Sequence, residues 1–124
     1  MSKIVDSLEE MERKLSRENG PFTLFALFER QDIPTQWDLV IAAPWIEQNN
    51  EQALRLVAGE MKKLLSTNDL QQVSRIVLLD SGDATVRAIT AEHLVEHGRL
   101  EIDEGSHYGL PAKRGYVITA RAAA

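Results

Sequence analysis

The sequence contains no cysteine. This absence excludes disulfide frameworks, thiolate zinc sites and cysteine nucleophiles, and it is typical of a reducing compartment. No apolar run approaches the roughly 20 residues that a membrane-spanning helix needs. The first residues also lack the basic and then apolar pattern of a signal peptide. We therefore expect a soluble cytoplasmic protein with no membrane partner.

Loops that hold phosphate or present a nucleophile are missing as well. The glycines Gly105, Gly109 and Gly115 are spaced as turns, and no G-x-S-x-G motif occurs. The net charge of −5 argues against a surface built to hold nucleic-acid phosphates. Nucleic acid is therefore not an expected partner, and no cofactor is indicated.

The composition predicts one globular domain over residues 1–124, with 44% hydrophobic and 27% charged residues. Both tryptophans and all three phenylalanines lie between Phe22 and Trp45. Two strand-like runs, 22–30 and 37–43, fall in this segment. The short polar loop between them contains Pro34 and predicts an antiparallel hairpin. We expect the core to be organised around this hairpin.

The remaining periodicity predicts helices on either side of the hairpin. An amphipathic helix is expected over residues 2–18, and its narrow apolar stripe consists of Ile4, Leu8, Met11 and Leu15. A long helix is expected from Asn49 or Asn50 to about Leu65. Further strands are expected at 75–80, 100–103 and 115–120, and short helices are expected at 84–89 and 90–97. The order of these helices and strands along the chain predicts an α+β two-layer sandwich. It has about five mostly antiparallel strands, an N-terminal helix and one long crossover helix.

The strands 22–30 and 37–43 are apolar on both alternating faces. The predicted helices cover one face of such a sheet comfortably. A second copy of the chain would cover the other face, so the sequence predicts a homodimer.

The sharpest motif is H-x-x-E-H, formed by His93, Glu96 and His97. On a helix, residues four apart share a face, so both imidazoles could bind one zinc ion while Glu96 polarises a water. The third ligand would come from Glu101, Glu104 or His107. The alternative is a surface helix end, where the helix dipole favours histidine. The motif therefore supports a metal-dependent hydrolase as the second hypothesis.

Two further acidic positions invite comparison with metal sites. Asp80 and Asp83 follow a predicted strand and could hold magnesium, although Asp83 could equally cap the next helix, with Gly82 permitting the turn. Asp38 lies on a predicted strand like a nuclease carboxylate. No E-x-K or Q-x-K triplet follows on the next strand, so a nuclease site is incomplete.

Other residues suit binding rather than reaction. Trp37, Trp45 and Phe25 are candidates for a contact surface because large aromatic residues are enriched at interfaces. For Trp45 the alternative is core packing under the loop. Lys113 and Arg114 form a compact basic spot that could receive a carboxylate or phosphate, or could be the solvated start of a strand.

Residues 27–30, 37–40, 43–45 and 74–80 (LFER, WDLV, APW and SRIVLLD) resemble a group of small uncharacterised bacterial proteins. The resemblance implies no activity and no cofactor. The element order is also similar to roadblock and longin-type domains, which are dimerising regulatory platforms, although their usual terminal helix is not predicted here.

Together these features predict a non-enzymatic homodimeric interaction or regulatory module. A metal-dependent hydrolase built on His93, Glu96 and His97 is the alternative. Small-ligand binding near Asp80 and Arg114 is a third hypothesis.

Overall fold

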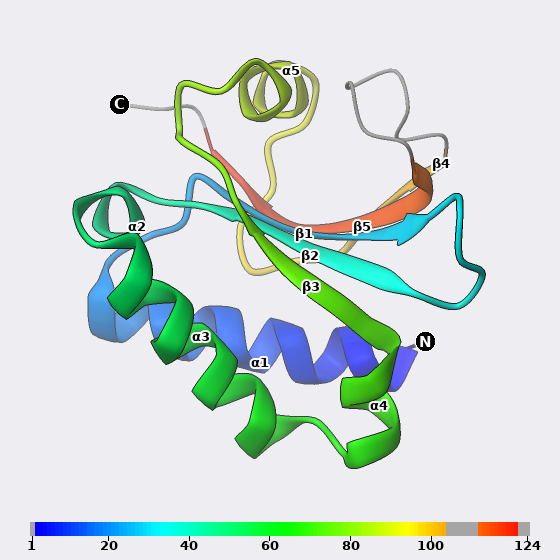
Figure 1. Ribbon diagram of the computed structural model, residues 1–124. Helices are drawn as coiled ribbons and strands as arrows, with labels where there is room; N and C mark the ends of the chain where they lie inside the picture. The colour runs from blue at the N-terminus through cyan, green and yellow to red at the C-terminus, as the bar shows by residue number, and fades with distance from the viewer. Residues whose placement is uncertain (1, 104–111, 122–124) are drawn as a thin grey trace.

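The computed structural model describes residues 2–103 and 112–121. Its five strands form one sheet in the order β3-β2-β1-β5-β4 (Figure 1). The strands are β1 (Leu24–Arg30), β2 (Trp37–Ala42), β3 (Val73–Leu78), β4 (Leu100–Asp103) and β5 (Ala112–Ala120). β3 runs parallel to β2, and every other pair of neighbours is antiparallel. The predicted α+β architecture and its mostly antiparallel sheet are confirmed.

Helices lie on both faces of the sheet (Figure 1). The helices are α1 (Ser2–Asn19), α2 (Pro44–Gln48), α3 (Asn50–Leu64), α4 (Thr67–Gln72) and α5 (Ala84–Glu92). α1 and α3 cover the first face, whereas α5 lies on the second face. α2, α3 and α4 connect β2 to the parallel strand β3 and so form the predicted crossover. No helix in the described part of the chain is long and apolar enough to cross a bilayer.

Side-chain caps set the starts of α3, α4 and α5. Asn49 accepts a hydrogen bond from the backbone N–H of Gln52 at the start of α3. Ser66 caps α4, and Asp83 accepts from the N–H of Thr85 at 2.8 Å at the start of α5. These bonds satisfy donors that have no partner within the helix. The predicted caps Asn49 and Asp83 are confirmed.

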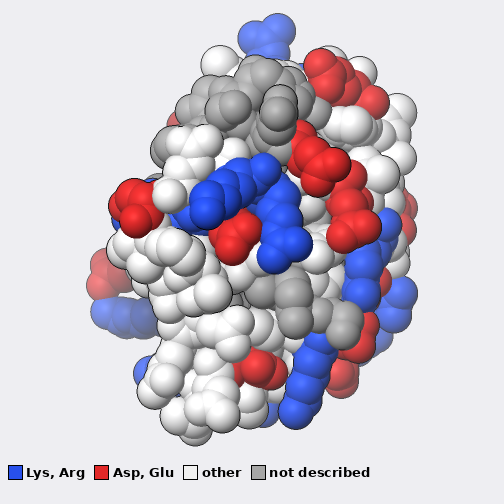
Figure 2. Space-filling model, turned by 90° about the vertical axis from the view of Figure 1, so that its right-hand side faces the viewer, with Lys and Arg blue, Asp and Glu red and all other residues white. Residues whose placement is uncertain are grey.

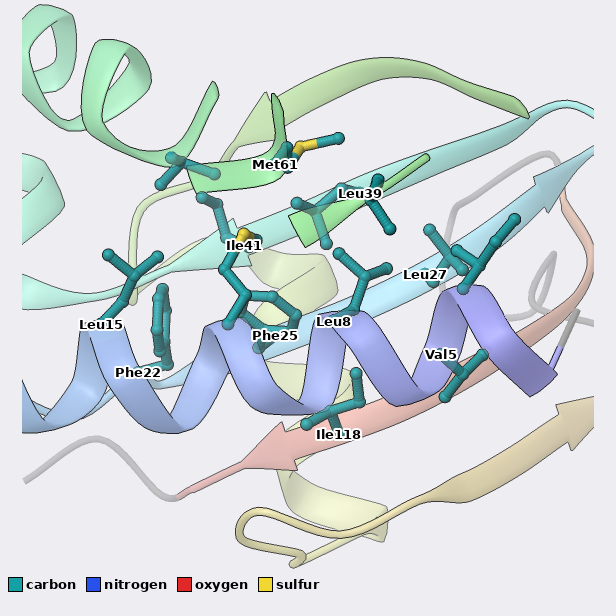
Figure 3. Close-up of a cluster of buried hydrophobic side chains, with 14 of the residues drawn as sticks. Val5, Leu8, Leu15, Phe22, Phe25, Leu27, Leu39, Ile41, Met61 and Ile118 are labelled. Atoms are coloured by element: carbon teal, nitrogen blue, oxygen red, sulfur yellow. The ribbon is translucent and has the colours of Figure 1, made fainter. Parts of the chain in front are cut away.

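The first core lies between the sheet and the helices α1 and α3. Figure 3 shows α1 side chains pointing toward those of the central strands. The labelled residues in the figure are Val5, Leu8, Leu15, Phe22, Phe25, Leu27, Leu39, Ile41, Met61 and Ile118. The predicted apolar stripe of α1, Ile4, Leu8, Met11 and Leu15, is buried in this core. Tertiary packing of that stripe stabilises α1.

A second core lies on the other face of the sheet. β1 alternates, so Phe25 and Leu27 enter the first core whereas Ala26 and Phe28 enter the second. From α5, the buried residues Val86 and Ile89 and their neighbours pack against this second face. The chain therefore covers part of the face that the dimer prediction left uncovered.

The chain departs from the predicted helix over residues 90–97. α5 ends at Glu92, and Val95 forms an antiparallel bridge with Ala120 through hydrogen bonds of 3.1 and 2.8 Å. His97 adopts a left-handed conformation with φ of 50°. Pairing with the end of β5 satisfies backbone groups that a longer helix would otherwise satisfy itself. The helix prediction for this segment was wrong because this pairing is not local in sequence.

Gly115 allows β5 to lie directly against Phe28. The two residues face each other across the β1–β5 pair. A Cβ atom on Gly115 would lie 2.4 Å from Cδ1 of Phe28, well inside van der Waals contact. The Phe28 ring therefore occupies the space that a side chain at Gly115 would need.

We expect Gly115→Ala to lower the free energy of unfolding by about 1–3 kcal/mol, because the Phe28 ring must move out of a packed core. Urea unfolding of the two proteins measures the difference. Gly82→Ala is the matched control, since a Cβ atom there meets nothing within 4 Å. Equal loss in both variants, or none in Gly115→Ala, would contradict the packing described.

An ion pair links α1 to α3. Lys14 Nζ lies 3.1 and 3.0 Å from the two carboxylate oxygens of Glu60, whose side chain is only 8% exposed. Lys63 lies 3.6 Å from the same carboxylate. The hydrogen bond from Lys14 and the positive charges of both lysines hold the pKa of Glu60 below its ordinary value.

This lowered pKa makes the ion pair stabilising at neutral pH, and that contribution is lost as the pH falls through the folded-state pKa. We expect Lys14→Met to make the free energy of unfolding depend less steeply on pH between about pH 5 and 3. Lys62→Met, the same change on an exposed neighbour in α3, should keep the original slope. Chemical unfolding at several pH values measures both slopes, and an unchanged slope in Lys14→Met would show that Lys14 does not lower the pKa of Glu60.

Candidate binding site

The second face of the sheet is hollowed beside the β1–β2 turn. The hollow has a volume of about 550 Å³, and no described residue of α5 lines it. Its apolar floor consists of Phe28, Val40, Val77 and Ala112. Its polar rim consists of Glu29, Arg30, Gln31, Asp32, Asp38 and Arg75. We refer to these ten residues as the hollow.

The strand register brings the hollow together from three segments. Phe28 pairs with Asp38, and Asp38 pairs with Arg75, so these residues form one row across β1, β2 and β3. Val40 and Val77 pair in a row two residues further along. Because side chains two residues apart on a strand share a face, both rows lie on the second face of the sheet. The apolar row leads toward the second core, and the charged row borders the turn.

The charged groups of the hollow occur as opposite pairs. Arg75 Nη2 lies 3.0 Å from Asp38 Oδ2. Arg30 donates two hydrogen bonds to Asp32, at 3.0 and 2.8 Å. This forked contact lowers the pKa of the Asp32 carboxyl and raises that of Arg30, to which the charge of Asp38 also contributes. Each guanidinium of the hollow is therefore matched by one carboxylate.

The third carboxylate of the rim is directed to a partner outside the hollow. Glu29 accepts a hydrogen bond from Arg114 Nε at 3.0 Å. Figure 2, which views the molecule from the side of the β1–β2 turn, shows acidic and basic side chains side by side rather than a region of one sign. A surface with balanced charges does not attract anionic ligands as a basic patch does.

Asp38 carries an oxygen that the protein leaves without a partner. Its side chain is only 13% exposed, and Oδ1 is buried with no hydrogen-bond partner, whereas Oδ2 meets Arg75. A buried carboxylate oxygen without a donor is costly unless something satisfies it. Asp38 therefore retains capacity to accept a hydrogen bond, at an atom that other protein atoms cover.

The structure places the predicted aromatic contact residues inside the molecule. Trp37 is 1% exposed and Phe25 fully buried, both in the first core. Trp45 is half-buried, and its Nε1 donates a 3.0 Å hydrogen bond to the carbonyl of Gly20. The ring also meets Phe22 edge-on at 5.4 Å. The alternative interpretation of Trp45, core packing under the loop, describes this arrangement.

The predicted basic spot is engaged with neighbouring residues. Arg114 pairs with Glu29, and its guanidinium carbon lies 5.3 Å from the centre of the Trp37 ring, within range of a cation–π contact. Lys113 is exposed on β5. Arg114 therefore closes the first core over Trp37 rather than presenting a free cation.

The three residues of the H-x-x-E-H motif do not share a helix face. His93 follows the last residue of α5. His97 Nδ1 lies 2.5 Å from Oε1 of the fully buried Glu12 in α1, and Glu96 pairs with Arg121 at 2.6 Å. Glu101 lies on β4, and the other two candidates for a third ligand, Glu104 and His107, lie outside the described residues.

Within residues 2–103 and 112–121, no three His, Asp or Glu side chains gather closely enough to hold a metal ion. The hydrolase hypothesis required a helix through the motif, and that helix ends at Glu92. The geometry on which the hypothesis rested is therefore missing in the described part of the chain.

The segment from Asp80 to Asp83 serves as a turn and a helix cap. The carbonyl of Asp80 accepts from the N–H of Asp83, and the Ser81 hydroxyl donates to Glu47 at 3.1 Å. Asp80 lies past the end of β3, whereas Arg114 lies beside the β1–β2 turn, at the opposite end of the sheet. The structure therefore does not bring together the Asp80 and Arg114 of the third hypothesis.

Sequence reasoning did not identify Arg30, Asp32 and Arg75 and considered Asp38 only as a nuclease carboxylate. The available signal was a charged residue at one end of each apolar strand: Arg30 at the end of β1, and Asp38 and Arg75 near the starts of β2 and β3. Their shared face depends on the pairing of β2 with β3, which residue spacing does not fix.

The segments that carry the resemblance to small bacterial proteins are β1, β2, β3 and their flanks. Their apolar residues supply both cores, and their charged residues line the hollow. The resemblance itself stays a prediction. Comparison of the chain with protein-family models, curated proteins and solved structures found no match.

Proposed function

We propose that this protein is a ligand-binding regulatory module that takes a small molecule into the hollow on the second face of its sheet. The observation that carries the proposal is a concave apolar floor bordered by Asp38, a largely buried carboxylate with an oxygen that lacks a partner. Small-molecule sites commonly combine an apolar floor with a few placed polar groups.

The size of the hollow supports this proposal. Its volume of about 550 Å³ lies within the range of roughly 300–1,000 Å³ that ligand pockets occupy. Contact with Val40 and Val77 would remove apolar ligand surface from water, at a gain of about 25 cal/mol per Å². The volume and the apolar floor of the hollow therefore both favour an organic ligand over a bare ion.

The chemistry of the rim supports binding rather than reaction. The described rim residues are two arginines, three carboxylates and a glutamine, and they include no histidine, serine or lysine. Arg30 and Arg75 are already held by Asp32 and Asp38. Groups fixed in this way orient a ligand, whereas proton transfer calls for a group poised near neutral pH.

We expect the uncharged probe 2-phenylethanol to shift the amide resonances of Phe28, Val40 and Val77 saturably in a ¹⁵N NMR titration. Val77→Trp should abolish these shifts, because Val77 is half-buried at the floor and a larger side chain there fills the hollow. Leu54→Trp, on the exposed side of α3, is the matched control and should leave them unchanged.

Circular dichroism and dispersed NMR spectra establish that both variants are folded. Saturable shifts that persist in folded Val77→Trp, or their absence in the wild-type protein, would contradict the proposed function. The titration uses an uncharged probe, so its outcome depends on the apolar floor rather than on the charged rim.

Homodimerisation stays a prediction, with a changed basis. α5 covers part of the second face, but β3 is an edge strand, and its free backbone groups could extend the sheet into a second copy. Size-exclusion chromatography with light scattering measures the mass. A dimer gives about twice the 13.9 kDa of the chain, and a constant 13.9 kDa at micromolar concentration and above would contradict it.

A further inference from the structure

We infer that the ligand of the hollow is a zwitterion with an apolar side chain, in the simplest case an apolar α-amino acid. This inference rests on the proposed function and specifies the chemical class of its ligand. It is carried by the pairing of charges in the rim, the unpartnered oxygen of Asp38 and the spacing between the charged and apolar rows.

The pairing of charges selects against ligands of one sign. Arg30 with Asp32 and Arg75 with Asp38 give a rim in which each positive group has its own negative group. A lone carboxylate bound there would face two aspartates, and a lone amine would face two guanidinium groups. Uncompensated charge in a partly buried site is costly. A zwitterion adds one group of each sign and keeps the balance.

The ammonium group of the ligand has an acceptor in Asp38. Oδ1 of this residue lacks a hydrogen-bond partner, and the carboxylate lies in the lining of the hollow. Oδ1 is covered by protein atoms, so a ligand reaches it only when a side chain that covers it moves aside. An ammonium group offers three donors and adds an opposite charge, which makes the contact stronger than a neutral hydrogen bond.

The carboxylate of the ligand has its donor in Arg75. This side chain is 58% exposed, and it contacts Asp38 through one terminal nitrogen, Nη2. A guanidinium carries five N–H donors in a fork that matches a carboxylate, so Arg75 can hold Asp38 and a second carboxylate together. Asp38 and Arg75 face each other in neighbouring strands, which places the ammonium and carboxylate partners side by side.

The spacing of the two rows fits the third substituent of an amino acid. Val40 and Val77 lie two residues beyond Asp38 and Arg75 on their strands, a separation of about 7 Å. A ligand held at the charged row therefore projects a side chain of leucine or phenylalanine size over the apolar row. Phe28 borders the charged row and supplies a further apolar surface.

Three probes with the same phenyl body test this inference: L-phenylalanine, phenethylamine and 3-phenylpropionate. Isothermal titration calorimetry on the full chain compares their affinities. We expect L-phenylalanine to bind about tenfold more tightly than either analogue, since each analogue lacks one charged contact. Equal or tighter binding of either analogue overturns the zwitterion and leaves the proposed function standing.

Two variants separate the charged contacts. Asp38→Asn should weaken L-phenylalanine and phenethylamine about tenfold and spare 3-phenylpropionate, whereas Arg75→Gln should weaken L-phenylalanine and 3-phenylpropionate and spare phenethylamine. Asp80→Asn and Arg55→Gln make the same charge changes outside the hollow and should alter no affinity. Each variant should still bind one of the two analogues. A variant that binds none of the three probes has therefore lost its fold.

Different results would contradict the inference and the proposed function. Binding of L-phenylalanine that is unchanged in both folded variants, Asp38→Asn and Arg75→Gln, overturns the inference alone. Absence of binding by all three probes, together with no saturable shift from 2-phenylethanol, overturns the inference and the proposed function together.

Discussion

The structure depends on one constraint, the burial of β1 on both of its faces. Residues from Leu24 to Phe28 are at most 3% exposed and alternate between two cores. A central strand of this kind requires cover on each side of the sheet. The helices α1 and α3 provide it on the first face, where the apolar stripe of α1 lies against Phe25 and Leu27.

Among the described residues, the cover on the second face is shorter. α5 has nine residues and buries Val86 and Ile89 against the sheet. The rows of β1, β2 and β3 beside the β1–β2 turn extend beyond this helix, and there the hollow lies. In the row that borders the β1–β2 turn, the charged residues Asp38 and Arg75 replace apolar ones. They neutralise each other there and can remain partly hydrated. The candidate site is therefore a consequence of how the second core ends.

Features that depend on local sequence were predicted correctly. The hairpin formed by β1 and β2, the stripe of α1 and the caps Asn49 and Asp83 each follow from neighbouring residues, and the structure confirms them. Their signals are periodicity, turn chemistry and capping preference, all of which act over a few residues.

Features that depend on contacts distant in sequence were missed. α5 stops at Glu92 because Val95 pairs with Ala120, and this pairing removed the helix on which the H-x-x-E-H interpretation relied. The hollow requires the parallel pairing of β2 with β3, which brings Asp38 to Arg75. Trp37 was expected at a contact surface, yet the fold places it under Arg114 in the first core. The charged residues of the site are visible in the sequence, but the pairing that brings them to one face is not fixed by residue spacing.

The most direct test of this account is a crystal structure of the full chain grown with L-phenylalanine. We expect electron density for the amino acid over Val40 and Val77, with its ammonium group on Asp38 and its carboxylate on Arg75. Density in the hollow from another part of the chain, or from a second copy, would show that the second face is completed by protein and would contradict the account.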